Sequence, residues 1–92
     1  MVFKARPNAT VVAPYDGEIA FTGPFRDYGN MVLVKHKSGL ISLIAGLGEV
    51  RANLGQKLLK GEPLGSMPNA PAPQAYIELR DRTAKPIDPG AQ

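Results

Sequence analysis

The sequence predicts a small all-β domain, and three of its features favour that fold class. The chain has 92 residues, which is enough for one hydrophobic core. Ten glycines and nine prolines divide it into short pieces, so no stretch carries a long helical pattern. Between these breaks lie short runs of apolar and β-branched residues, which are typical of strands. We therefore expect a single domain over residues 1–92.

The first strands are predicted from a β-branched run and a turn. Residues 10–12 form the run, and the Asp and Gly of the segment 15–17 favour a turn. The next strand covers residues 17–23, and its alternation is expected to place Ile19 and Phe21 on the same face.

The most apolar strands of the chain follow. Residues 25–30 are predicted to be a hairpin loop, and the runs 31–36 and 40–45 are joined by a short turn at 37–39. This hairpin is expected to supply much of the core. The segment 46–67 is rich in glycine, and its spacing favours tight turns between very short strands over a helix.

The last predicted strand, residues 75–80, has polar side chains on one face and apolar side chains on the other. Because side chains alternate along a strand, Gln74, Tyr76, Glu78 and Arg80 should share one face. The side chains expected in the core are Ala75, Ile77 and Leu79. A tyrosine beside a glutamate and an arginine offers stacking area and charge-assisted hydrogen bonds, which suits protein recognition. The alternative is a face that is merely solvated.

Composition limits the classes of function. The net charge of +3 suits an anionic partner, but the lysines and arginines are scattered along the chain. The six Tyr and Phe residues are also dispersed, and this lack of a basic and aromatic face disfavours nucleic-acid binding. The absence of cysteine excludes disulfides and thiolate metal sites. No apolar run approaches the roughly 20 residues of a transmembrane segment.

Motifs for catalysis are weak. A catalytic zinc needs about three protein ligands, and the chain has a single histidine, His36, whose simplest interpretation is a strand-end residue with local hydrogen bonds. Ser38 and Ser42 lie near it in sequence, but no nucleophile elbow surrounds either serine. The segment 46–51, "GLGEVR", begins like the G-x-G-x-x-G fingerprint of dinucleotide-binding sites, but Arg51 stands where that fingerprint needs its third glycine. We therefore interpret these glycines as turn residues. No lysine has the setting of a biotinyl or lipoyl attachment site.

Three segments together carry a family resemblance. Residues 11–47, 50–65 and 75–89 are similar to the LytM-type zinc peptidase domain, also called lysostaphin-like. Within that family, the "YGN" and "ELR…PIDP" motifs resemble the non-catalytic branch typified by the murein hydrolase activator EnvC. The resemblance implies a small β-sandwich with a grooved antiparallel sheet and a motif of short strands. It also implies that the chain is a C-terminal piece of a longer protein.

The resemblance places the positions of the family's zinc chemistry on residues that cannot perform it. Active members bind zinc through a His-x-x-x-Asp segment and a His-x-His pair, and they use a further catalytic histidine. The His-x-His positions fall on Gln74 and Tyr76, the catalytic histidine falls on Gly46, and the Asp would align near Val2. The resemblance therefore implies a domain without metal, cofactor or enzymatic activity.

The function that the resemblance implies is the binding and activation of a periplasmic N-acetylmuramoyl-L-alanine amidase, which would cleave peptidoglycan during cell separation. The expected partner-binding groove has Gln74, Tyr76, Glu78 and Arg80 on its floor and Arg26 and Tyr28 in a bordering loop. A peptidoglycan-binding module is the alternative, and an active zinc endopeptidase is a third interpretation. An exposed strand edge could also pair with a second copy of the chain.

Overall fold

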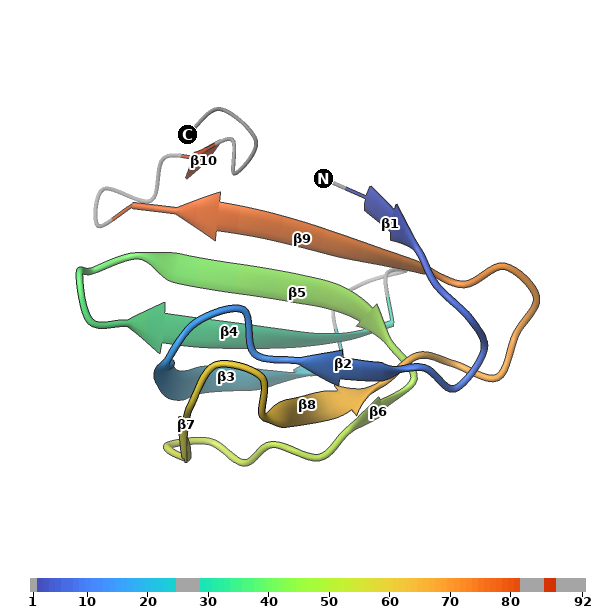
Figure 1. Cartoon of the computed structure of the whole chain (residues 1–92), viewed down its shortest axis with the longest axis horizontal. Coiled ribbons are helices and arrows are strands. Elements are labelled where there is room, and N and C mark those ends of the chain that lie inside the picture. The colour runs from blue at the N-terminus through green and yellow to red at the C-terminus, as the bar shows by residue number, and fades with distance from the viewer. Residues whose placement is uncertain (1, 25–28, 82–85, 88–92) are drawn as a thin grey trace.

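The computed structural model describes residues 2–24, 29–81 and 86–87, and the regular elements in this part are all β-strands (Figure 1). The strands are β1 (Val2–Lys4), β2 (Thr10–Val12), β3 (Gly17–Pro24), β4 (Asn30–His36), β5 (Ile41–Leu47), β6 (Glu49–Val50), β7 (Lys57–Leu58), β8 (Pro63–Ser66), β9 (Gln74–Arg80) and β10 (Pro86–Ile87). The all-β prediction is confirmed, and so is the prediction of very short strands in the glycine-rich middle of the chain. None of the described residues form a helix that could cross a membrane.

The strands form two antiparallel sheets. The main sheet has seven strands in the order β1-β9-β5-β4-β3-β7, with β10 also paired to β9. The small sheet has three strands in the order β2-β8-β6. The predicted hairpin of β4 and β5 lies at the centre of the main sheet, where β5 also pairs with β9 along most of its length. β9, the last strand that the sequence predicts, is thus held next to the centre of the sheet.

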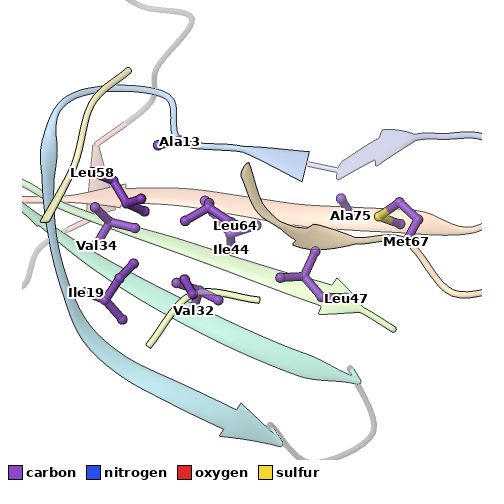
Figure 2. Close-up of a cluster of buried hydrophobic side chains, with 11 residues drawn as sticks. Ala13, Ile19, Val32, Val34, Ile44, Leu47, Leu58, Leu64, Met67 and Ala75 are labelled. Atoms are coloured by element: carbon purple, nitrogen blue, oxygen red, sulfur yellow. The ribbon is translucent and has the colours of Figure 1, made fainter. Parts of the chain in front are cut away.

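The core lies between the two sheets (Figure 2). The main sheet contributes Ile19, Val32, Val34, Ile44, Leu47 and Ala75, while Leu64, Met67 and Ala13 come from the strands and loops of the small sheet. Burial of these side chains is the principal favourable term for a domain of this size. Of the residues predicted to face inward from the last strand, Ala75 belongs to this cluster and Ile77 packs against it, and Leu79 is also buried.

The prediction that Phe21 shares the buried face of Ile19 is wrong. Ile19 pairs with Val34 and Phe21 pairs with Leu33, so Ala20 is an extra residue on its strand. Such a β-bulge moves the following side chain to the other face of the sheet. Ile19 is accordingly 1% exposed, whereas Phe21 is 41% exposed.

The outer edge of β9 is partly covered by two short strands. Residues of β1 pair with Gln74, Ala75 and Tyr76, and residues of β10 pair with Leu79 and Arg80. Pairing of a sheet edge with a second copy of the chain stays a prediction.

Candidate functional site

A hollow of about 560 Å³ lies at the end of the main sheet where β5 finishes and β9 begins. In Figure 1 this end is on the right, beside β1. The hollow is lined by Val2, Gly29, Asn30, Gly46, Leu47, Gly48, Pro68, Gln74, Ala75 and Tyr76. The four positions that the family resemblance assigns to zinc chemistry therefore gather around a single hollow.

Strand register explains why these positions meet. Val2 of β1 lies directly opposite Tyr76 of β9, and Tyr76 lies opposite Ala45 of β5. Ala45 in turn lies opposite Met31 of β4. This row is on the outer face of the main sheet, where Met31, Ala45 and Leu43 are buried and Tyr76 packs against them. Val2 and Tyr76, at the β1 end of this row, line the hollow.

Gly46 occupies a second β-bulge, at the edge of the hollow. Asn30 pairs with Leu47 and Met31 pairs with Ala45, so Gly46 is the extra residue of β5. Its φ is +93°, and a Cβ at this position would overlap the carbonyl oxygen of Gln74. The backbone conformation is therefore one that only glycine adopts without strain. The bulge also turns Leu47 inward, where it is 1% exposed.

A hydrogen-bonded network runs along the outer face of β9. The hydroxyl of Tyr76 donates to Oε2 of Glu78 over 2.9 Å. Nη2 of Arg80 donates to the same oxygen over 3.2 Å and lies 3.1 Å from Oε1. The prediction that these three side chains share one face is confirmed. Because Arg80 is ion-paired to Glu78, reversing its charge would place two carboxylates together and disturb the network itself.

The structure brings together part of the predicted groove. Gln74 and Tyr76 line the hollow, while Glu78 and Arg80 extend away from it along the same strand and are not among its lining residues. A strand rises about 3.3 Å per residue, so Gln74 and Arg80 are about 20 Å apart along β9. The other two predicted groove residues, Arg26 and Tyr28, lie outside the described residues.

The side chains around the hollow do not fit a catalytic zinc. Zinc in proteins is bound by histidine, cysteine, aspartate or glutamate, and none of the described residues that line the hollow is of these types. The polar side chains there are already used in part: Asn30 donates to the carbonyl oxygen of Gly48 over 3.2 Å, and the Tyr76 hydroxyl donates to Glu78. Nor does any group of three or more His, Cys, Asp and Glu residues that could hold a metal occur in the described part of the chain.

His36 is a buried residue with local hydrogen bonds, as its sequence position predicts. Its Nδ1 lies 2.8 Å from the carbonyl oxygen of Asp16, and its Nε2 lies 2.7 Å from Oγ of Ser42. A carbonyl oxygen only accepts, so Nδ1 carries the donated proton, and in the neutral imidazole Nε2 accepts the proton of Ser42. Ser42 is 0% exposed, so no substrate can reach its hydroxyl. The pair ties β4, β5 and the bend before β3 together.

Ser42→Ala is expected to lower the free energy of unfolding by about 1–3 kcal/mol, because it leaves Nε2 of His36 buried without its partner. Chemical denaturation of the variant measures this change. Ser38→Ala, in the exposed turn after β4, is the matched control and should have little effect. Equal stability of the two variants would contradict the structural role of the pair.

Other residues that line the hollow were not singled out from the sequence. Gly29 and Asn30 follow the segment that the resemblance places at the border of the groove, where only Arg26 and Tyr28 were named, and Pro68 comes from the proline-rich segment before β9. Long-range strand pairing and the hydrogen bond from Asn30 to the carbonyl oxygen of Gly48 bring these residues to the site. Neither interaction can be predicted from a local sequence pattern.

The chain is similar to proteins of known sequence and to solved structures. It is 34% identical to the cell division protein DipM of Caulobacter vibrioides over 95 residues, which include 94% of this chain. The match spans 16% of the length of DipM. A catalytic domain of the prophage-encoded M23 protein EnpA from Enterococcus faecalis superposes with a TM-score of 0.84 at 20% identity, over 98% of this chain and 74% of that one.

The catalytic domain of the antimicrobial peptidase lysostaphin from Staphylococcus simulans superposes with a TM-score of 0.82 at 17% identity, over 97% of this chain and 73% of that one. At such low identities the two solved structures show a shared fold and no more. The model of peptidase family M23 matches residues 1–89. With almost its whole length matched, and with a fold shared by LytM-type and lysostaphin-like structures, the chain belongs to peptidase family M23.

Proposed function

We propose that this chain is a non-catalytic M23 domain that binds a cell-wall amidase in the periplasm and activates it for peptidoglycan cleavage during cell separation. The observation that carries the proposal is a hollow whose described lining residues include no histidine, cysteine, aspartate or glutamate that could hold zinc. Gly46, Gln74 and Tyr76, on which the family resemblance places the three histidine positions, all line that hollow.

The chemistry of the hollow favours binding over catalysis. Its walls are mostly glycine, proline and aliphatic residues, and its polar groups are the amides of Asn30 and Gln74 and the hydroxyl of Tyr76. Concave apolar surfaces with few polar groups are typical binding sites for side chains of a partner. No group in this set is suited to activate a water molecule.

The similarity to DipM supports a role in cell division. DipM is described as a cell division protein, and the match includes nearly all of the present chain. A domain that acts on a cell-wall enzyme would be placed outside the inner membrane.

Binding assays with two targets test the proposed function. In one experiment the purified chain is mixed with a periplasmic cell-wall amidase from the same organism. In the other it is mixed with purified peptidoglycan sacculi. We expect saturable binding to the amidase and weak, salt-sensitive binding to sacculi, because a net charge of +3 attracts an anionic polymer without specificity. Tight binding to sacculi with no binding to the amidase would favour a peptidoglycan-binding module instead.

We expect the chain to retain no stoichiometric zinc and to release no peptide from peptidoglycan. The residues lining the hollow lack the imidazole and carboxylate ligands that zinc requires. The measurement is metal analysis after incubation with zinc and exhaustive dialysis, combined with a peptide-release assay. One tightly held zinc per chain, or measurable peptide release, would contradict the assignment.

A further inference from the structure

A second hollow, of about 530 Å³, lies at the opposite end of the main sheet from the hollow described above. It is lined by Tyr15, Asp16, His36, Lys37, Ser38, Leu40, Lys60 and Leu79. In Figure 1 this end is on the left, where the turn between β4 and β5 meets the end of β9. The first hollow, at the other end of the sheet, shares none of these lining residues.

The walls of the second hollow are held in place by hydrogen bonds. Asp16 links two of them, because its carbonyl oxygen accepts from His36 and its Oδ1 accepts from the backbone N–H of Lys60 over 2.7 Å. A second hydrogen bond holds the turn that contains Lys60, because the backbone N–H of Gly61 donates to the carbonyl oxygen of Ala13 over 2.9 Å. The turn after β4 is closed by a bond of 2.7 Å from His36 N–H to the carbonyl oxygen of Leu40. The site is therefore preorganised, which lowers the entropic cost of binding.

The charges in the second hollow favour a single negative charge. Lys37 and Lys60 are exposed, and neither forms an ion pair within the described ranges. Asp16 is the acidic residue among the lining residues, and one of its carboxylate oxygens already accepts a backbone hydrogen bond. Two ammonium groups and one carboxylate leave a formal charge of +1, which one monoanion would neutralise.

The remaining walls favour a ligand with an apolar body. Leu40 and Leu79 provide aliphatic surface, and the ring of Tyr15 stands edge-on to His36, with 5.6 Å between the ring centroids and 88° between the planes. Because His36 is fixed by two hydrogen bonds, this contact helps to position Tyr15 at the rim. Apolar walls with a few placed charges are typical of small-molecule sites.

We propose that the second hollow binds an organic monocarboxylate with a small apolar body, such as the C-terminal end of a short acylated peptide. Lys37 and Lys60 pair with the carboxylate, and Tyr15, Leu40 and Leu79 cover the apolar part. This site is separate from the amidase contact, so it stands or falls independently of the proposed function.

The test is a titration of the isotope-labelled 92-residue chain followed by amide chemical shifts at low ionic strength. The probes are N-acetyl-L-alanyl-L-alanine, its C-terminal amide, acetate and inorganic phosphate. We expect the carboxylated dipeptide to shift the amides of Tyr15, Lys60 and residues 37–40. The amidated dipeptide, acetate and phosphate should each bind at least about tenfold more weakly, because each lacks the single charge, the apolar body or both.

Paired variants separate this site from general charge. The double variant Lys37→Ala with Lys60→Ala should weaken binding of the dipeptide at least about tenfold, whereas Lys35→Ala with Lys57→Ala removes the same charge elsewhere and should bind like the parent. A dispersed amide spectrum checks that each variant is folded. Equal binding of the acid and its amide, equal binding of phosphate, absence of shifts around the second hollow, or equal affinity of the two double variants would overturn the proposal.

Discussion

Replacing Gly46 with alanine is expected to lower the free energy of unfolding by about 3 kcal/mol or more. The φ of +93° is a conformation that L side chains rarely adopt, and the new Cβ would also overlap the carbonyl oxygen of Gln74. A strained φ costs about 1–3 kcal/mol and overpacking costs about 1–3 kcal/mol in addition. Chemical denaturation followed by circular dichroism measures the change.

Gly55→Ala is a matched control for this prediction. Gly55 has a similar φ of +83°, but a Cβ there would meet nothing within 4 Å. Its cost should therefore be that of the backbone conformation alone, about 1 kcal/mol. If the two variants lost equal stability, Gly46 would not be held against β9 as the structure places it. The same overlap would arise with histidine or any other residue that carries a Cβ at this position.

Filling the first hollow with the substitution Gln74→Trp is expected to weaken binding of the amidase at least about tenfold. Gln74 is exposed and lines the hollow, so a larger side chain can occupy the space that the partner needs without disturbing the core. Exposed substitutions usually change stability by no more than about 0.5 kcal/mol, whereas a blocked pocket at the centre of an interface costs about 2 kcal/mol or more. Titration calorimetry with purified amidase gives the affinities.

Two further variants make the result interpretable. Gln74→Ala, which shortens the side chain and leaves the hollow open, should bind the amidase much as the parent does. Lys57→Trp adds the same bulk on β7, at the other edge of the main sheet, and should also have little effect. Unchanged affinity of a folded Gln74→Trp variant would place the partner on another face of the domain.

Much of the fold could be predicted because the strands have strong local signals. Glycine and proline mark their ends, and the short apolar runs of β4 and β5, rich in β-branched residues, are typical of central strands. The bulges at Ala20 and Gly46 could not be predicted in this way. Apolar residues lie on both sides of each bulge, so the sequence pattern is compatible with either register, and tertiary packing decides which side chains turn inward.

The candidate site was predictable in part for the same reason. Alternation along one strand is local, and the hydrogen bonds that join Tyr76, Glu78 and Arg80 confirm that these three side chains share one face of β9. The bonds that engage Glu78 with Tyr76 and Arg80, and the end of the strand at which the hollow opens, depend on side-chain packing and on strands distant in sequence. Local periodicity carries no information about either.

The most direct test of the central claim is reconstitution of peptidoglycan cleavage from purified components. Sacculi are incubated with the 92-residue chain alone, with the amidase alone, and with both, and the release of soluble wall fragments is followed over time. We expect no release by the chain alone, slow release by the amidase, and release at least about tenfold faster when both are present. Release by the chain alone, or an amidase rate that a saturating concentration of the chain leaves unchanged, would contradict the proposed activation.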